Sequence, residues 1–202
     1  MKIKAVIFDL DGTITRQFFN FDNIRAEMGI SKDDGPVWEA MMKLSSEQRM
    51  LSERILARYE RRGVEESSLN DGVSKTLERL KELGIRTGIL TRNTAVNAME
   101  VLKKHGLEFD GVIGRDDGPV KPDAFGVLSL CELFEVQPQN TLVVGDYLYD
   151  LMCAKNAGAV GVLLKSHRHA ENFIDQAEFS IDRIDEVLEI IDDYNLSKEE
   201  RA

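Results

Sequence analysis

Short apolar segments alternate with longer amphipathic segments along most of the chain. The apolar segments have the length of buried strands, and the amphipathic segments carry apolar residues at helical spacing and mostly end at a glycine. The predicted strands are 3–8, 85–90, 111–114, 141–145 and 159–164, and the predicted helices are 72–84, 94–106, 122–134, 148–158 and 182–194. Pro122 would open its helix, because proline is favoured in a first turn. This alternation predicts an α/β fold with a Rossmann-like, doubly wound and mostly parallel sheet.

One region, residues 16–70, interrupts the alternation. It contains three helical patterns, at 22–29, 37–44 and 45–63, and no convincing strand. We therefore predict a core domain made of residues 1–15 and 71–202 and an inserted α-helical cap domain at 16–70. Ligands of open α/β sheets bind beyond the carboxyl ends of the strands, so an insertion rooted there would cover the site as a lid. The alternative is that these helices only add to the core.

Composition and charge limit the classes of function. The 202 residues are 43% hydrophobic and 31% charged, as in ordinary soluble domains. The net charge of −10 argues against a nucleic-acid partner and against an anionic membrane surface. Two cysteines, Cys131 and Cys153, give no disulfide framework. No apolar run approaches the ~18 residues of a membrane span, and carboxylates interrupt the N-terminal apolar segment, so we expect a cytoplasmic protein.

The segment AVIFDLDGTIT, at residues 5–15, places two carboxylates at the end of a buried strand. If the strand geometry persists, Asp9 and Asp11 share one face, because side chains two residues apart point the same way. A bound cation, a raised pKa on one acid or a nearby basic side chain would relieve their repulsion. The alternative is an ordinary polar turn, since aspartate and glycine are common turn residues.

Other polar side chains follow the predicted strands and belong to the same edge of the sheet. Thr91 follows the strand 85–90, Asp146 follows the strand 141–145, Asp150 lies one helical turn later, and Lys121 precedes a helix. Carboxylates converging from two strands form a hard-oxygen site that suits Mg²⁺. A hydroxyl, a lysine and the amides of a helix N-terminus form a phosphate site.

These residues also carry a resemblance to a known family. The DLDGT segment at 9–13, Thr91 after a strand, Lys121–Pro122 and the GDYLYD segment at 145–150 resemble, in order, the four motifs of the haloacid dehalogenase-like hydrolases. The helical insertion resembles the cap of the phosphoglycolate phosphatase and β-phosphoglucomutase branch. Tyr147 stands where many relatives carry serine, and Asp71 stands where many carry proline.

The resemblance implies a phosphatase that forms an aspartyl-phosphate intermediate. Asp9 would be the nucleophile, and Asp11 would be the general acid and then the base that activates water. Thr91 would hydrogen-bond the phosphoryl oxygens, together with the backbone amide of Arg92. Lys121 would neutralise negative charge on the nucleophile and the phosphoryl group.

The same resemblance implies a Mg²⁺ cofactor. The implied ligands are Asp9, the backbone carbonyl of Asp11, and Asp146, with Asp150 as a direct or water-mediated partner. The reaction would be hydrolysis of a small organic phosphate monoester, such as phosphoglycolate or a sugar phosphate. A phosphotransferase or mutase acting on sugar phosphates and a non-enzymatic phospho-accepting signalling module remain alternatives.

The sequence points only indirectly to the parts that choose a substrate. Arg16, Gln17 and Asn20 follow the first motif closely enough to reach the far end of a small phosphorylated metabolite. The three phenylalanines of the same stretch are better explained as core packing. His167 and His169 are interpreted as solvated loop residues, because no third histidine or cysteine lies nearby to complete a metal site. The sequence does not indicate the oligomeric state.

Overall fold

The computed structural model describes residues 2–199 of the chain. Residue 1 and residues 200–202, which the sequence analysis assigns to the core domain, lie outside the described residues. The chain divides into two compact units, one made of Met1–Gln17 and Ser68–Ala202 and the other of Phe18–Ser67. We refer to them as the core unit and the helical unit.

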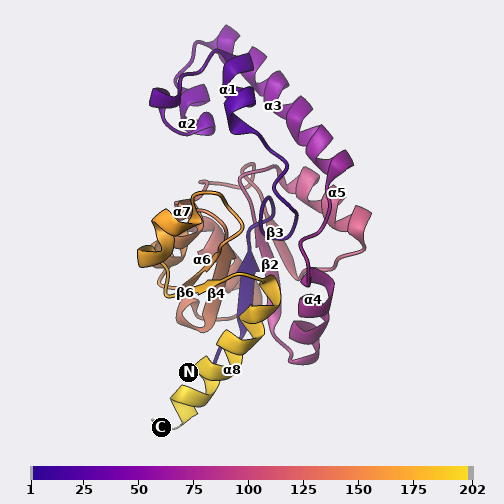
Figure 1. The fold of residues 1–202 in the computed structure, drawn as a ribbon, viewed down its shortest axis with the longest axis vertical. Helices are drawn as coiled ribbons and strands as arrows, with labels where there is room; N and C mark the ends of the chain where they lie inside the picture. The colour runs from indigo at the N-terminus through magenta and orange to yellow at the C-terminus, as the bar shows by residue number, and fades with distance from the viewer. Residues whose placement is uncertain (1, 200–202) are drawn as a thin grey trace. The chain divides into compact units, whose positions relative to one another are not determined.

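The core unit is built on one six-stranded sheet with the order β3-β2-β1-β4-β5-β6 (Figure 1). Every pair of neighbouring strands is parallel, which confirms the predicted α/β fold with a parallel sheet. The strands are β1 (Ala5–Phe8), β2 (Arg86–Leu90), β3 (Gly111–Ile113), β4 (Thr141–Gly145), β5 (Val160–Leu164) and β6 (Phe179–Ile181).

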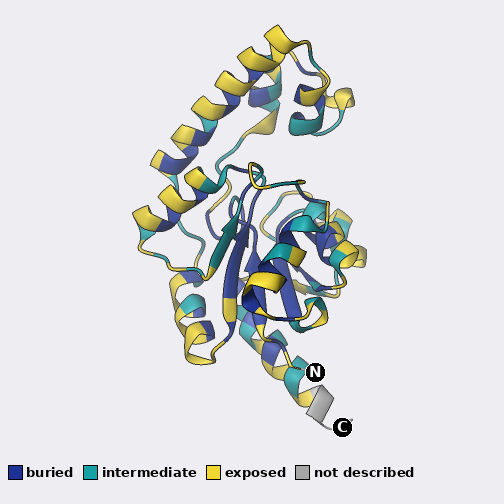
Figure 2. Cartoon of the chain, turned by 180° about the vertical axis from the view of Figure 1, so that it is seen from behind, coloured by how far each residue is buried: buried dark blue, intermediate teal, exposed yellow. Residues whose placement is uncertain are grey.

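Helices cover the sheet, as the burial of its central strands shows (Figure 2). All four residues of β1 are fully buried, so both of its faces are packed. The helices of the core unit are α4 (Val73–Glu82), α5 (Ala95–His105), α6 (Phe125–Phe134), α7 (Leu148–Ala157) and α8 (Val187–Glu199). The apolar faces of α6 and α7 pack on β1 and β4 in one buried cluster, which includes the two free cysteines.

The register of the central strands brings their carboxyl ends together. Phe8, the last residue of β1, pairs with Ile89 of β2 on one side and Val144 of β4 on the other. The amide of Asp9 continues the ladder by donating to the carbonyl of Val144 at 2.9 Å. Residues that directly follow β1, β2 and β4 therefore meet at one edge of the sheet.

Two predicted helices begin later than expected, and one observed strand was not predicted. The helix predicted from Pro122 begins at Phe125, because the carboxylate of Asp123 accepts from the Phe125 amide at 2.8 Å. The closing helix is α8, which starts at Val187 after a 3-10 turn at Ile184–Glu186, not at residue 182. Strand β6 was not predicted, since only Ile181 of its three residues is buried.

The helical unit has a core of its own. It consists of α1 (Phe21–Met28), α2 (Val37–Met42) and α3 (Ser46–Glu66), with a 3-10 turn at Lys32–Asp34. Ile30, Ala40, Met41 and Leu56 form its buried cluster. Gly63 of α3 leaves space for the ring of Phe19, since a Cβ there would lie 2.8 Å from that ring. Phe19 also contacts the rings of Phe18 and Phe21. Phe18 and Phe19 are half-buried, whereas Phe21 is 47% exposed, so the interpretation as core packing is wrong for Phe21.

None of the helices within residues 2–199 combines the length and the apolar character that crossing a membrane requires. The longest helix, α3, has charged residues throughout its 21 positions.

Candidate active site

Three buried carboxylates meet at the carboxyl edge of the sheet. Asp9, Asp146 and Asp150 each place one oxygen within 4.8 Å of the others, and each residue is at most 8% exposed. Asp9 follows β1, Asp146 follows β4, and Asp150 lies in the first turn of α7. We call these three residues the carboxylate cluster. Oxygen ligands at such spacing could hold a metal ion, and hard divalent cations prefer them.

Two glycines make room for the carboxylate cluster. A Cβ on Gly145 would lie 2.1 Å from Cγ of Asp150, and a Cβ on Gly12 would lie 2.3 Å from Oδ2 of Asp146. Gly12 also adopts a φ of +99°, a conformation that disfavours any other residue. The glycines of the first and fourth motifs are therefore required by the close approach of neighbouring side chains.

Lys121 lies inside this cluster and is itself 4% exposed. Its ammonium donates to Oδ1 of Asp9 at 2.5 Å and to Oδ1 of Asp150 at 2.6 Å. The predicted juxtaposition of a lysine with the acidic residues is therefore present, although Lys121 lies in a turn that ends three residues before α6.

Burial and charge shift the proton affinities of this group. Burial, opposed by the charge of Lys121, raises the pKa of Asp9 to about 6. Burial and repulsion from Asp9 and Asp150 raise the pKa of Asp146 well above its ordinary value. Burial alone would lower the pKa of Lys121, but attraction to Asp150 and Asp9 outweighs it, so its pKa is raised and it stays charged.

Asp11 lies apart from the carboxylate cluster. Strand β1 ends at Phe8, so the strand alternation that would put the side chains of Asp9 and Asp11 on one face does not extend to Asp11. Its side chain is half-buried, and Oδ2 accepts from Nδ2 of Asn93 at 3.4 Å. The expected set of four acidic residues thus divides into three carboxylates that cluster and a fourth that faces Asn93.

Thr91 and Asn93 form the polar end of β2. Thr91 is 3% exposed, and its hydroxyl accepts from the Asn93 amide at 3.0 Å. Asn93 was not predicted as a site residue, although its position two residues after Thr91 was a usable signal. Arg92, between them, places its guanidinium carbon 4.9 Å from the ring centre of Tyr149.

Asn70 is a second residue near the candidate site that the sequence did not reveal. Its side-chain amide donates to the carbonyls of Gly12, Thr13 and Thr15, at 3.1, 2.7 and 3.2 Å. Its backbone amide donates to the Ile14 carbonyl at 3.0 Å. Asn70 thus fixes the loop that carries Asp11. An asparagine before an Asp-Gly pair resembles any turn, so no sequence signal identified it.

The residues expected to reach the far end of a substrate have other contacts. Arg16 is paired with Asp71 at 2.7 Å and donates to the Leu69 carbonyl at 3.2 Å. The side chain of Asn20 caps α1 by accepting from the amides of its second and third following residues. Gln17 is exposed, and its side-chain oxygen would lie 2.9 Å from a Cβ on Gly12, which places it beside the loop of Asp11.

Comparisons with known proteins agree with the motif order. A family model of the haloacid dehalogenase-like hydrolases matches residues 6–163. Phosphoglycolate phosphatase of Vibrio parahaemolyticus is 28% identical, over 94% of this chain and 96% of its own length. Pyrophosphatase PpaX of Bacillus cereus is also 28% identical, over 98% and 100%. A solved hydrolase from Pseudomonas syringae superposes with a TM-score of 0.77 at 23% identity, over 94% and 98%, which is a likeness of fold.

Asn70→Ala should lower the free energy of unfolding by about 1–3 kcal/mol, because three backbone carbonyls lose their side-chain donor. Chemical denaturation followed by circular dichroism would measure the loss. Asn156→Ala is the matched control, since the exposed Asn156 makes one hydrogen bond, to the Pro122 carbonyl. Equal losses for the two variants would show that Asn70 does not anchor the loop.

In the presence of a chelator, the contribution of Asp9 to the stability of the protein should fall as the pH rises from about 4 to about 6, the range between the ordinary and the raised pKa of this carboxyl. Asp9 binds its proton more tightly when folded, with a pKa of about 6. Its contribution is therefore complete below the unfolded pKa and is lost as the pH passes the folded value. The loss should approach about 1.4 kcal/mol per pH unit for one proton.

Thermal and denaturant unfolding at several pH values would measure this profile. Asp9→Asn cannot titrate and should show a flatter profile over the same range. A profile of the unaltered protein that is no steeper than that of Asp9→Asn between about pH 4 and pH 6 would contradict the raised pKa of Asp9.

Proposed function

Because the chain belongs to the haloacid dehalogenase-like hydrolases, we propose that it is a Mg²⁺-dependent phosphatase of small organic phosphate monoesters. The reaction would proceed through an aspartyl-phosphate on Asp9. The observation that carries the proposal is the buried ammonium of Lys121 between Asp9 and Asp150, beside a third carboxylate. Phosphoryl transfer depends chiefly on positioning and charge neutralisation, and this arrangement supplies both.

The charge balance of the carboxylate cluster suits a divalent cation. Three ionised carboxylates and one ammonium leave an excess of two negative charges, and burial, with repulsion between the carboxylates as a smaller cause, raises the pKa values of Asp9 and Asp146. Asp9, Asp146 and the backbone carbonyl of Asp11 would hold Mg²⁺, with Asp150 as a direct or water-mediated partner. When bound, the ion would neutralise charge on the phosphoryl group and on the nucleophile.

The side chains divide the chemistry between them. A carboxylate oxygen of Asp9 attacks phosphorus, and the bond from phosphorus to the alcohol oxygen breaks. Asp11 gives its proton to that oxygen, so the alcohol leaves neutral. Asp11 then takes a proton from a water molecule, and the water oxygen attacks phosphorus. The bond from phosphorus to the Asp9 oxygen breaks, phosphate leaves, and Asp9 is again a carboxylate. Its position outside the carboxylate cluster supports this separate role, since it need not share the strong field of Asp9, Asp146 and Asp150.

The phosphoryl oxygens would be bound by the hydroxyl of Thr91, the amide of Arg92 and the ammonium of Lys121. The geometry that supports this is the shared edge: Thr91 follows β2, which pairs with the strand that precedes Asp9. The helical unit, inserted between residues 17 and 68, would be the cap of the branch that the sequence resembles.

The names of two relatives support part of the proposed substrate class, the small organic phosphates. The Vibrio relative is named for phosphoglycolate and the Bacillus relative for pyrophosphate, both small phosphorylated compounds. The family match favours hydrolysis over a phospho-accepting signalling module. A mutase would differ in its products, since it needs a bisphosphate primer and releases little inorganic phosphate. We expect the protein to act on this metabolite in the cytoplasm.

With Mg²⁺, the protein should release inorganic phosphate from members of a panel of small phosphorylated metabolites. Exhaustive chelation by EDTA should abolish the release, and Mg²⁺ should restore it. Ca²⁺ should restore it poorly, because its larger coordination number would draw both oxygens of Asp9 onto the ion. Full turnover after chelation would contradict the metal assignment, and transfer without phosphate release would identify a mutase.

Asp9→Asn should abolish turnover, because an amide cannot attack phosphorus. Asp11→Asn should slow an alkyl phosphate by ~10²–10⁴-fold, the typical contribution of general acid–base assistance. The slowing of the first step should be smaller for an aryl phosphate, because its oxygen leaves without a proton. Loss of the base still slows the attack of water in the second step, so aspartyl-phosphate should accumulate with this substrate. Glu132→Gln, an exposed carboxylate-to-amide change on α6, is the matched control.

Mass spectrometry of an acid-quenched reaction would locate the added phosphoryl group. The expected site is the peptide that contains Asp9. A phosphoryl group on another peptide would overturn the assignment of the nucleophile. An Asp11→Asn variant equally slow on aryl and alkyl phosphates would overturn the role of Asp11.

A further inference from the structure

A continuous series of ring contacts crosses the carboxyl edge of the sheet in the core unit. Arg92 lies over the ring of Tyr149 at 4.9 Å, and Tyr149 contacts Tyr147 edge to face at 5.1 Å. Tyr147 contacts the ring of His167 at 5.1 Å, and His167 contacts His169 at 5.4 Å. We call these five residues the rim. It begins after β2 and ends in the loop after β5, so it spans the strands that carry the carboxylate cluster.

The rim is joined to the candidate active site at three places. Arg92 directly follows Thr91, and Tyr147 directly follows Asp146. At the far end, the hydroxyl of Ser166, one residue before His167, donates to the Gly12 carbonyl at 2.8 Å. The rim therefore borders the loop of Asp11 and the carboxylate cluster through adjacent residues and a hydrogen bond, all within one compact unit.

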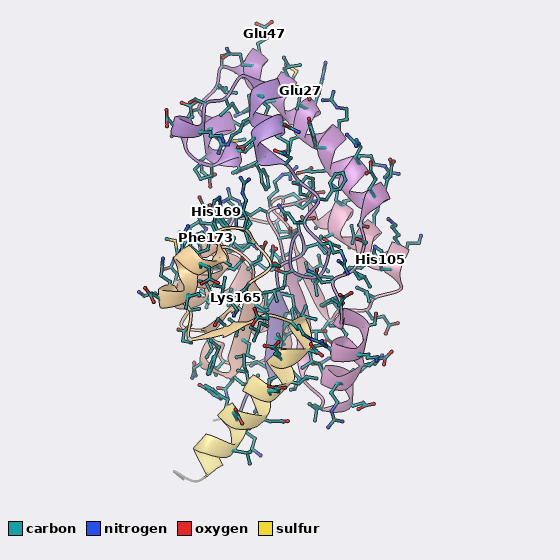
Figure 3. The ribbon with its side chains drawn as sticks, viewed as in Figure 1. Glu27, Glu47, His105, Lys165, His169 and Phe173 are labelled. Carbon is teal, nitrogen blue, oxygen red and sulfur yellow. The ribbon has the colours of Figure 1, made fainter. Side chains whose placement is uncertain are left out.

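The rings of the rim pack against one another and restrict each other's rotation. The ring of Tyr147 has three edge-to-face neighbours, Tyr149, His167 and Phe173, each with its centre 5.1 Å away. Phe173 comes from the 3-10 helix Ala170–Gln176, which packs on α7. Figure 3 shows Phe173 and His169 on the same side of the core unit, in the region of α7. Edge-to-face packing on three sides restricts rotation of the tyrosine ring.

The rim gathers donors and positive charge in a chain whose net charge is −10. Arg92 of the rim carries a permanent charge, and so does Arg168, which is not one of the five rim residues but lies between His167 and His169 in the sequence. Nδ1 of His167 accepts from the His169 amide at 3.1 Å, so the neutral ring carries its proton on Nε2, where it can be donated. Anions are attracted to such a local concentration of guanidinium and imidazole groups.

We infer that the rim is a subsite for a second anionic group of the substrate, a carboxylate or a second phosphate on a short leaving group. The inference rests on the proposed phosphatase function and names its substrate class. It differs from the expectation that Arg16 and Asn20 set specificity, because those side chains pair with Asp71 and cap α1. Neutral alcohol leaving groups would find no ionic partner on the rim.

The test compares two phosphate monoesters that differ in their second group. 2-Phosphoglycolate carries a carboxylate, and ethyl phosphate has a neutral tail of similar size. The double variant His167→Phe with Arg168→Gln keeps an aromatic ring against Tyr147 and removes the donor and the charge. The ratio of kcat/KM for 2-phosphoglycolate to that for ethyl phosphate should fall about tenfold, mainly through KM, since one charge-assisted hydrogen bond contributes roughly this much.

Arg79→Gln on α4 is the matched control for charge, because Arg79 is an exposed residue paired with Glu82. It should leave the ratio within twofold of the unaltered protein. Inorganic pyrophosphate, in the same assay, separates recognition of a second phosphate from recognition of a carboxylate. An unchanged ratio in the double variant, or an equal loss for both esters, would overturn the subsite.

Failure of the phosphatase proposal is distinguishable from failure of the subsite. If the unaltered protein hydrolyses neither of these esters nor any member of the metabolite panel, the phosphatase proposal is contradicted, and calorimetric binding of the same two esters then tests the rim. The subsite predicts tighter binding of 2-phosphoglycolate than of ethyl phosphate and loss of that preference in the double variant. Equal affinities in the unaltered protein would overturn it.

Discussion

The ion pairs of Lys121 are the interaction on which the rest of the site depends. Buried carboxylates are strongly destabilised unless they are paired, and here one ammonium serves Asp9 and Asp150 while Asp146 remains beside them. The group is therefore one that a divalent cation or a proton would complete. Burial first, and repulsion between neighbouring carboxylates second, raise the pKa values of Asp9 and Asp146, and the uncompensated negative charge makes the site suitable for a cation.

The backbone around this pair is adapted to its crowding. Gly12 and Gly145 leave the space that two carboxylates occupy, and the register of β1 with β4 brings Asp9 beside Asp146. Glycine is therefore required at these two motif positions, because a side chain there would collide with a carboxylate of the cluster. Substitution of either glycine would displace a charged side chain from the centre of the site.

The sheet and most of its helices could be predicted from the sequence, because buried parallel strands are continuous apolar runs and the helices between them end at glycines. The meeting of Asp9, Asp146, Asp150 and Lys121 was also predictable, since each follows or precedes an element whose end lies at the same edge. Short or irregular pieces were not predictable. Strand β6 buries one residue, and the start of α6 is set by a hydrogen bond from the Phe125 amide to Asp123 rather than by the proline.

Residues whose contacts are long-range could not be predicted from the sequence, for a different reason. Asn70 contacts residues more than 50 positions away, and nothing in its local sequence distinguishes it from a turn residue. The rim joins Arg92 to His167 across four strands, so its continuity follows from strand order and side-chain rotamers. The sequence could identify His167 and His169 only as loop residues. The substrate contact of Arg16 stays a prediction, and in the structure its guanidinium is paired with Asp71.

The two linkers of the helical unit are paired with one another inside the core unit. The Arg16 amide donates to the Ser68 carbonyl, and the Asn70 amide donates to the Ile14 carbonyl, so the chain leaves and returns as a short two-stranded stem. Changes of length or sequence within residues 18–67 would leave the hydrogen bonds of the stem in place, and with them the backbone around Asp11.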